Sequence, residues 1–437
     1  MFEIGRELKR FFQPAAPRDG LSLGDEALLE LLDLDLLTAE ARSAGVAAGR
    51  IGEQDKARRL IEAAGVWREL ARRSGNPAAL RKSASAAEQA GQLARSQGRG
   101  QVEALAICEQ ARSGLVGADL FGEDGLHAAA DHILTQADQT DEVRALHASV
   151  KARLALGGAD PALLNGAIKD FGAVLAGRLR LRASERLRLR LERAELLVAA
   201  GARFRDVSMI GQALAEVAEL ISALDGAYNP LRLARAHELR AQALLKLADL
   251  RGDAAAALGA LEALDAALDL TLPDHSPLDW ARLQHGRGLA FTALAEAGED
   301  ERSFLKALQA FGQALGVVGT HPHLALRATA VQDRVACMVR QAEARGDGFA
   351  LDEAEAALRC ELAALKSPPE PLAWAVLQLN LARIYEAQAK ARGADRGERA
   401  RASEALLAAF EVFSETGVRS LANLAADSLD RIREGAF

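Results

Sequence analysis

The chain has 437 residues, of which 50% are hydrophobic, only 4% aromatic and 26% charged, and its net charge is −7. This length exceeds one ordinary globular core and indicates several domains or a repeat array. The negative balance argues against a general nucleic-acid-binding protein. The sequence has no run of 18 apolar residues, so no membrane-spanning helix is predicted.

The first residues predict a short amphipathic helix over residues 1–12. Its apolar face carries Ile4, Leu8, Phe11 and Phe12. Three roles are open for this helix: it caps the apolar end of a repeat array, docks into a partner or a second copy, or contacts a membrane surface weakly. The segment lacks the apolar core of a signal peptide, so we expect a cytoplasmic protein, with peripheral attachment to the inner membrane as the alternative.

An acidic, leucine-rich segment follows the N-terminal helix. We expect one helix from Asp25 to about Ala44, with Asp25 as its N-cap. Because leucines occupy so many of its sides, neighbouring helices should cover it.

From about residue 55 onward, apolar residues at helical spacing alternate with short breaks that contain Gly or Pro. The breaks divide this part of the chain into about seventeen predicted helices. Every second helix combines small and large apolar residues on one face, a pattern typical of close helix packing. The best examples are Ala307, Ala310, Phe311, Ala314 and Leu315; Ala167, Phe171, Val174 and Leu175; and Ala405, Leu406, Ala409, Phe410 and Phe413.

Two near-identical motifs reveal an internal repeat. Pro277-Leu278-Asp279-Trp280-Ala281 and Pro371-Leu372-Ala373-Trp374-Ala375 begin 94 residues apart. Weaker copies open at Pro230 and at Pro322, where Leu324 stands in place of the Trp. The four prolines are separated by 47, 45 and 49 residues, a period that indicates stacked helical hairpins. Burial between consecutive hairpins is the expected role of Trp280 and Trp374.

These motifs resemble tetratricopeptide repeats, clearly over about residues 182–434 and more weakly over residues 58–181. The resemblance implies an all-α fold, a right-handed superhelix (α-solenoid) of antiparallel helical hairpins. Gly288 and Ala382 stand where the family has its Gly. Because the period here is 45–49 residues rather than the family's 34, the family's peptide-binding positions are not carried over. We therefore expect an N-terminal helix, linker and acidic capping helix over residues 1–57, divergent hairpins over residues 58–181, and tetratricopeptide-like repeats over residues 182–437.

Charge is divided unevenly between the two helices of the predicted hairpins. Over the last five hairpins, the first helices carry a net charge of +6 and the second helices −10. The resemblance implies that first helices line a concave groove, which would favour an acidic segment of a partner protein. The residues expected to contact that partner are Arg235, Arg282, Arg327 and Arg334.

A second basic cluster lies at the start of the clearer repeats. Arg182, Arg186, Arg190 and Arg193 share one predicted helical face. The cluster lacks the aromatic residues that stack on nucleic-acid bases. A face that is solvated or paired with the interleaved glutamates remains one alternative, and a surface for an anionic partner remains the other.

Motifs for catalysis are missing from the sequence. There is no phosphate-binding glycine loop and no nucleophile motif, and the histidines lack metal-ligand spacing. Cys108, Cys337 and Cys360 are widely spaced, so we expect no disulfide framework and three buried thiols. The 45 arginines against 9 lysines suggest a GC-rich bacterial genome.

The sequence as a whole predicts a non-catalytic scaffold or adaptor that binds a partner protein segment, without cofactor or metal. The alternative is a peripheral membrane or polar-localised structural protein anchored by residues 1–12. The partner's identity and the oligomeric state are left open by the sequence.

Overall fold

The computed structural model describes ten ranges of the chain. They are residues 26–50, 53–123, 125–157, 160–177, 179–298, 301–321, 323–345, 348–364, 371–415 and 419–433. Within them the chain is helical, and no strand occurs. From α4 onward the described residues hold seventeen helices, as the pattern of breaks predicts.

The helices of the described residues are α2 (Glu26–Leu29), α3 (Leu34–Arg50), α4 (Glu53–Ser74), α5 (Pro77–Ser96), α6 (Gly100–Phe121), α7 (Gly125–Gln136), α8 (Asp141–Gly157), α9 (Pro161–Ala176), α10 (Ala183–Phe204), α11 (Val207–Ala223), α12 (Pro230–Arg251), α13 (Ala254–Asp269), α14 (Pro277–Gly298), α15 (Glu301–Val318), α16 (Ala325–Arg345), α17 (Gly348–Ala364), α18 (Pro371–Arg392), α19 (Glu398–Glu415) and α20 (Arg419–Arg433).

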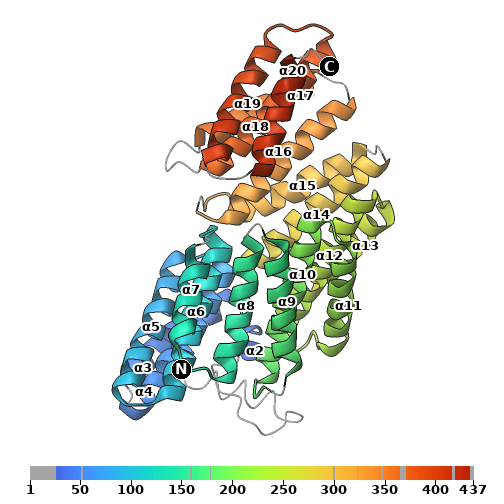
Figure 1. Ribbon diagram of the computed structural model, residues 1–437. Helices are drawn as coiled ribbons and strands as arrows, with labels where there is room; N and C mark the ends of the chain where they lie inside the picture. Colours follow the sequence, from blue (N-terminus) through green and yellow to red (C-terminus); the bar gives the residue numbers. More distant parts are fainter. Residues whose placement is uncertain are drawn as a thin grey trace. The chain divides into compact units, whose positions relative to one another are not determined.

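Consecutive helices form antiparallel hairpins joined by short connections (Figure 1). The even-numbered helices α4 to α18 are the first helices of the hairpins, and the odd-numbered helices α5 to α19 are the second helices. First helices of neighbouring hairpins also contact each other directly: α4 contacts α6, α6 contacts α8, α8 contacts α10, and α16 contacts α18. This arrangement is an all-α tandem repeat of tetratricopeptide-like hairpins. The handedness of the superhelix stays a prediction.

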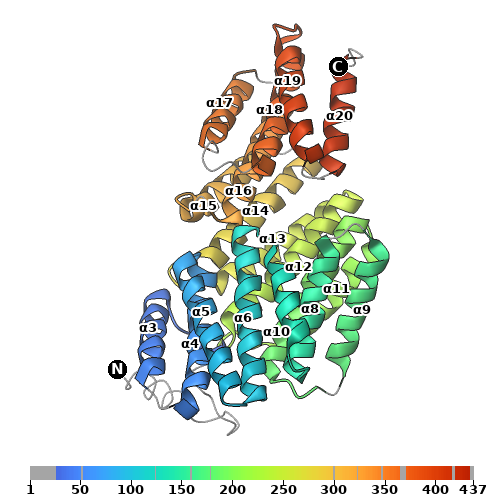
Figure 2. The same ribbon diagram turned by 60° about the vertical axis from the view of Figure 1, so that its left-hand side comes forward.

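The chain divides into two compact units, which are described separately. Unit 1 comprises residues 1–246 and 263–280, and unit 2 comprises residues 247–262 and 281–437. Helices α12, α13 and α14 therefore contribute residues to both units. The N-terminal helices of unit 1 and the C-terminal helices of unit 2 can be followed in a second view (Figure 2).

In unit 1, polar residues before the helices mark where the helices begin. The Asn76 side chain accepts a hydrogen bond from the Ala78 N–H at 2.9 Å, and Asp206 accepts one from the Ser208 N–H at 2.8 Å. Such N-caps satisfy N–H groups that have no partner within the helix. Between the caps, small and large apolar side chains pack together, as Ala111, Leu134 and Leu146 do across α6, α7 and α8.

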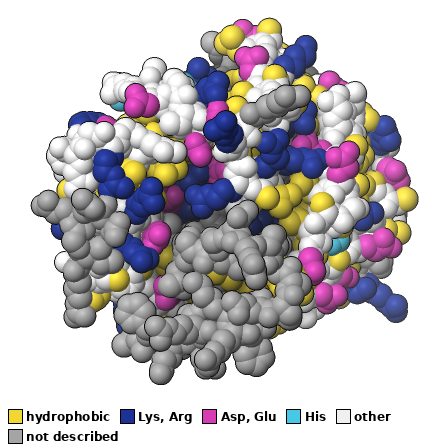
Figure 3. Space-filling model, turned by 90° about the horizontal axis from the view of Figure 1, so that it is seen from below, with side chains coloured by type: hydrophobic (Ala, Val, Ile, Leu, Met, Phe, Trp, Pro, Cys, Tyr) yellow, Lys and Arg dark blue, Asp and Glu magenta, His cyan; other side chains and the backbone are white. Residues whose placement is uncertain are grey.

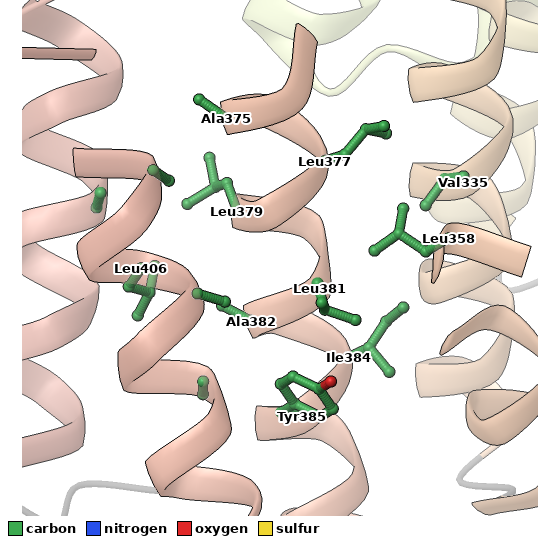
Figure 4. Close-up of a cluster of buried hydrophobic side chains, with 14 of the residues drawn as sticks. Val335, Leu358, Ala375, Leu377, Leu379, Leu381, Ala382, Ile384, Tyr385 and Leu406 are labelled. Atoms are coloured by element: carbon green, nitrogen blue, oxygen red, sulfur yellow. The ribbon is translucent and has the colours of Figure 1, made fainter. Parts of the chain in front are cut away.

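In unit 2, the largest core cluster surrounds α18 on two sides (Figure 4). Leu377, Leu381 and Ile384 point toward Val335 of α16 and Leu358 of α17. On the other side, Leu379 and Ala382 point toward Leu406 of α19. Because α18 is apolar on both sides, it is covered by the preceding hairpin and by its own second helix.

The packing of first and second helices follows the predicted small-and-large pattern in α15. Ala307, Ala310, Phe311 and Ala314 are all buried. A Cβ placed on Gly288 of α14 would lie 2.5 Å from Cε1 of the Phe311 ring. The glycine therefore leaves the space that the Phe311 ring occupies.

The same pattern is only partly correct elsewhere. Ala405, Leu406, Ala409 and Phe413 of α19 are buried, but Phe410 is 36% exposed. The sequence predicts that Trp280 and Trp374 are buried, but both side chains are only partly buried. Trp374 packs against the large core cluster of unit 2.

Two further expectations are wrong. Cys108 and Cys337 are buried, but Cys360 is exposed on α17, because it lies on the side of that helix away from Leu358 and Leu362. The single helix expected from Asp25 to about Ala44 is broken after Leu29, and α3 starts at Leu34. The Asp33 carboxylate accepts a hydrogen bond from the Leu36 N–H at 2.7 Å and so begins a new helix.

Candidate functional site

Charged side chains link the first helices of unit 1 to one another. Arg68 of α4 pairs with Glu109 of α6, and Glu109 also pairs with Arg112 at 3.4 Å. Arg112 reaches Glu185 of α10 at 2.6 Å. The series continues along α10 through Arg188 and Glu192. We call these six residues the ion-pair ladder: Arg68, Glu109, Arg112, Glu185, Arg188 and Glu192.

The ladder is largely shielded from solvent. Arg68, Glu109 and Glu185 are all buried. Each buried carboxylate has an arginine partner, which offsets the cost of removing the charge from water. At the far end, the Ser149 hydroxyl of α8 donates to Glu192, so the ladder joins four first helices.

A second charged cluster joins residues that lie more than 200 positions apart in the sequence. Arg72, near the end of α4, donates two hydrogen bonds to the Asp279 carboxylate of α14, at 2.9 and 2.8 Å. Arg72 also pairs with Glu69 one turn earlier on α4. The Ser276 hydroxyl donates to the same Asp279 carboxylate at 2.6 Å.

The end of α2 completes this cluster. The Glu30 carboxylate accepts hydrogen bonds from the backbone N–H groups of Leu231 and Arg232, both at 3.1 Å. Its other oxygen lies 3.0 Å from Nε of Arg232. These contacts place the Glu30 carboxyl group at the N-terminus of α12, where the unpaired N–H groups and the helix dipole favour its ionised form. We call this cluster the junction: Glu30, Glu69, Arg72, Arg73, Arg232 and Asp279.

Arg73 anchors the junction from the side of α4. Its side chain is fully buried and donates to the carbonyl oxygens of Leu29 and Leu32 and to the Glu69 carboxylate. Burial alone would raise the pKa of Glu69, but the ion pairs with Arg72 and Arg73 outweigh it and lower the pKa to about 2. Glu69 is therefore ionised across the physiological range.

The sequence analysis missed the junction, although one signal for it exists. The two near-identical motifs differ at their third position, which is Asp279 in one copy and Ala373 in the other. In the first copy the carboxylate binds Arg72. A polar residue that departs from its repeat can thus mark a contact that the repeat itself does not require.

Internal ion pairs involve Arg235 and Arg327, two of the four residues that the sequence analysis predicts to contact a partner. Arg235 lies 2.8 Å from both Glu195 and Glu238 in unit 1. In unit 2, Arg327 lies 3.3 Å from Glu361 and donates to the Gly319 carbonyl at 3.2 Å. The other two, Arg282 of α14 and Arg334 of α16, are partly exposed. All four remain predictions as partner contacts.

The basic cluster of α10 is likewise engaged within unit 1. Arg186 donates to the carbonyl oxygens of Leu175 and Leu179, both at 3.0 Å, and so holds the connection from α9 to α10. Arg190 and Arg193 both pair with Glu216 of α11. Arg182 is exposed at the N-cap of α10. The partners are thus mainly on α11 and the backbone rather than on the interleaved glutamates, and an anionic-partner surface here stays a prediction.

Charged side chains of both signs are also visible from outside. On the face shown in Figure 3, Lys and Arg side chains gather around the centre, with Asp and Glu between them.

No group of three or more His, Cys, Asp or Glu side chains in the described ranges has the geometry to hold a metal ion. Among the helices of those ranges, none combines the length and hydropathy needed to span a bilayer. The predicted apolar face of Ile4, Leu8, Phe11 and Phe12 lies outside the described residues.

Comparison with known proteins adds similarity in fold alone. No protein family matches the sequence, and no characterised protein matches it. Among solved structures, the chain is similar to a Rap protein complexed with competence and sporulation factor (12% identity, TM-score 0.47, covering 87% of this chain and 98% of that chain). It is also similar to the apo form of RapI (11%, 0.41, 91% and 98%) and to the human IFIT1 dimer with PPP-AAAA (12%, 0.38, 95% and 94%).

These similarities are too low to carry an argument about function. The stacked antiparallel hairpins of the structure themselves make the chain a tetratricopeptide-like helical-repeat protein.

Proposed function

We propose that this chain is a non-catalytic scaffold that binds an acidic segment of a partner protein on its first helices. The observation that carries the proposal is the separation of charge, +6 on five first helices against −10 on their second helices. First helices contact one another directly from α4 to α10 in unit 1, and α16 contacts α18 in unit 2. An extended or helical segment could therefore contact several hairpins at once.

Charge would act mainly on the rate and specificity of this association. A basic layer attracts an acidic segment over about 10 Å at 0.1 M salt and repels segments of the wrong sign. Arginine is well suited to such contacts because its planar group donates two parallel hydrogen bonds to one carboxylate. Binding should therefore weaken as salt concentration rises.

Arg235 is a poor choice for a test because it forms two internal ion pairs. Reversing Arg235 would place a third carboxylate beside Glu195 and Glu238 and would destabilise unit 1. The partly exposed Arg282 and Arg334 are better choices, because a neutral Gln there preserves the shape of the helix. A matched control is Arg302→Gln with Lys306→Gln, which removes the same charge from exposed positions of the second helix α15.

The experiment has two steps. A partner is first captured on the purified full chain and identified by mass spectrometry, and its dissociation constant is then measured by calorimetry. We expect Arg282→Gln/Arg334→Gln to weaken binding roughly five- to tenfold and to reduce its salt dependence, since each exposed charge contributes modestly. The α15 control should leave the affinity within about twofold. Equal losses in both variants, or none in either, would contradict binding on the first helices.

A further inference from the structure

Unit 1 contains a closed circuit of contacts between its helices. First helices contact one another from α4 to α10, and an ion pair joins α10 to α12. The junction then joins the end of α4 to the start of α14 through Arg72 and Asp279, and the end of α2 to the start of α12 through Glu30 and Arg232. In an open repeat array a hairpin contacts only its neighbours, so these contacts show that the helices of unit 1 curve back on themselves.

Apolar packing holds together the helices on one side of the junction. Leu29 belongs to a buried cluster with Val66 and Leu70 of α4 and Ala79 of α5. Among the described residues, that cluster contains none from α12 or α14. Arg73 of α4 adds hydrogen bonds to two carbonyl groups of residues 29–32. The end of α2 is therefore attached to α4 and α5 more extensively than to the starts of α12 and α14.

The contacts that Glu30 and Arg72 make across the junction are charged. The Arg72 guanidinium donates to both oxygens of the Asp279 carboxylate, at 2.9 and 2.8 Å. The Glu30 carboxylate accepts hydrogen bonds from the Leu231 and Arg232 N–H groups, both at 3.1 Å. Water can replace these partners when the two sides separate, whereas separation of neighbouring hairpins would expose apolar side chains. Arg72 and Asp279 are 207 residues apart, so no short connection tethers the two sides.

We propose that unit 1 opens at the junction, where α2 and α4 meet the starts of α12 and α14, before it opens between neighbouring hairpins. When the two sides separate, Arg72 keeps Glu69 of its own helix as a partner, and Arg232 keeps the Asn229 side chain just before α12. These remaining partners limit the free energy of the open state. Opening breaks the circuit and would let an extended segment reach the first helices of unit 1 from the side.

The internal repeat suggests a variant that weakens the junction and leaves the helices intact. Ala373 stands at the position of Asp279 in the other copy of the motif, and α18 still begins at Pro371. Asp279→Ala is therefore compatible with the start of α14, and Glu30→Gln removes the second carboxylate with little change in shape. Because charge-assisted hydrogen bonds contribute about tenfold or more each to such an equilibrium, the double variant should open at least about a hundredfold more often than the wild type, and Asp279→Ala alone about tenfold more often.

Distances between pairs of spin labels on the full chain, measured during a urea titration, test the proposal without any partner protein. Asp35→Cys on α3 and Ala227→Cys before α12 carry labels at exposed positions on the two sides of the junction. Arg81→Cys on α5 and Ala129→Cys on α7 carry a second pair across the boundary between neighbouring hairpins. Cys360→Ser first removes the exposed thiol, and the other two cysteines are buried.

The order of the two transitions decides the outcome. In the double variant Glu30→Gln/Asp279→Ala, the junction distance should lengthen at a clearly lower urea concentration than the hairpin distance, and at a lower concentration than in the wild type. The matched control Glu62→Gln/Glu88→Gln removes two more exposed carboxylates from α4 and α5 and should behave as the wild type. Coincident transitions in the double variant, or a hairpin distance that lengthens first in either protein, would overturn the proposal. Neither result bears on whether the first helices bind an acidic segment.

Discussion

At the scale of single residues, the hairpins depend on a few positions where a first helix leaves room for a large side chain of its second helix. Gly288 against Phe311 is the clearest example in unit 2. In unit 1, a Cβ on Gly201 of α10 would lie 2.6 Å from Cγ1 of Ile210 on α11. In both hairpins the missing side chain lets two helix backbones approach, and the large residue fills the space.

We expect Gly288→Ala to destabilise unit 2 by about 1–3 kcal/mol, because the new methyl group would overlap the buried Phe311 ring. The control is Gly312→Ala on the neighbouring α15, where a Cβ would meet nothing within 4 Å. That change should instead stabilise the helix by roughly 0.5–1 kcal/mol, since Ala is the better helix former. Urea unfolding followed by circular dichroism measures both.

A double variant tests whether the ring is the cause. Adding Phe311→Leu to Gly288→Ala should recover part of the loss, as the smaller side chain makes room for the methyl group. Losses that simply add would show that Phe311 is not what makes Gly288 necessary.

At the scale of elements, ion pairs set the position of one first helix against the next. Glu109 of α6 holds Arg68 of α4 on one side and Arg112 on the other, and Arg112 reaches across to α10. Alanine-rich faces could slide past one another with little change in buried area. Charged groups that must be paired when buried give the helices a preferred register.

We expect Glu109→Gln to destabilise unit 1 by about 3–5 kcal/mol, because it removes the carboxylate that pairs with the buried Arg68 and with Arg112. The comparison is Glu62→Gln, which removes the partner of Arg59 in a more exposed pair on α4. That change should cost at most about 1 kcal/mol. Thermal or urea unfolding of both variants would check this, and similar losses in the two would show that burial does not govern the pairing.

Most helices could be predicted from the sequence because their causes are local. Pro277 and Pro371 open helices where the motif places them, and the second-helix pattern of Ala and Phe in α15 matches its buried face. The break between α2 and α3 could not be predicted in this way. It is stabilised by Arg73 and by the start of α12, and neither is visible in the local pattern of leucines.

The same distinction explains what was missed at the candidate site. Arginines on first helices can be recognised from sequence, but their partners cannot. Arg235 pairs with Glu195 of another helix, and Arg327 pairs with Glu361 of its own hairpin. The packing of the helices decides which arginines pair within the chain. The periodicity of the sequence alone does not reveal this pairing.

At the scale of the whole molecule, the junction should make unit 1 sensitive to acid. The pKa of Glu69 is about 2 in the folded chain and 4.5 ordinarily. A lowered pKa means that the stabilisation is fully present above pH 4.5 and is lost as the pH falls toward 2. The loss from Glu69 alone should reach about 3 kcal/mol.

Comparison with Glu69→Gln isolates this contribution. The free energy of opening would be measured by hydrogen exchange of α4 amides at several values between pH 5 and 2.5. The variant should be less stable than the wild type at pH 5, and the gap should narrow as the pH falls. Glu88→Gln on the exposed side of α5 should follow the wild type throughout. A gap of constant size would contradict the assignment.

The bond between Arg72 and Asp279 also has a consequence for how the protein is made. In most repeat arrays each hairpin contacts only its neighbours and can fold as soon as it is complete. Here the partners are separated by 207 residues, so a ribosome working at about 5–20 residues per second needs roughly 10–40 s between them. During that interval Arg72, Arg73 and Glu30 have been synthesised but Arg232 or Asp279 has not. Until the start of α14 emerges, the nascent chain therefore carries charged side chains that will be shielded in the folded protein but do not yet have their final partners. The N-terminal hairpins reach their full stability only after that point.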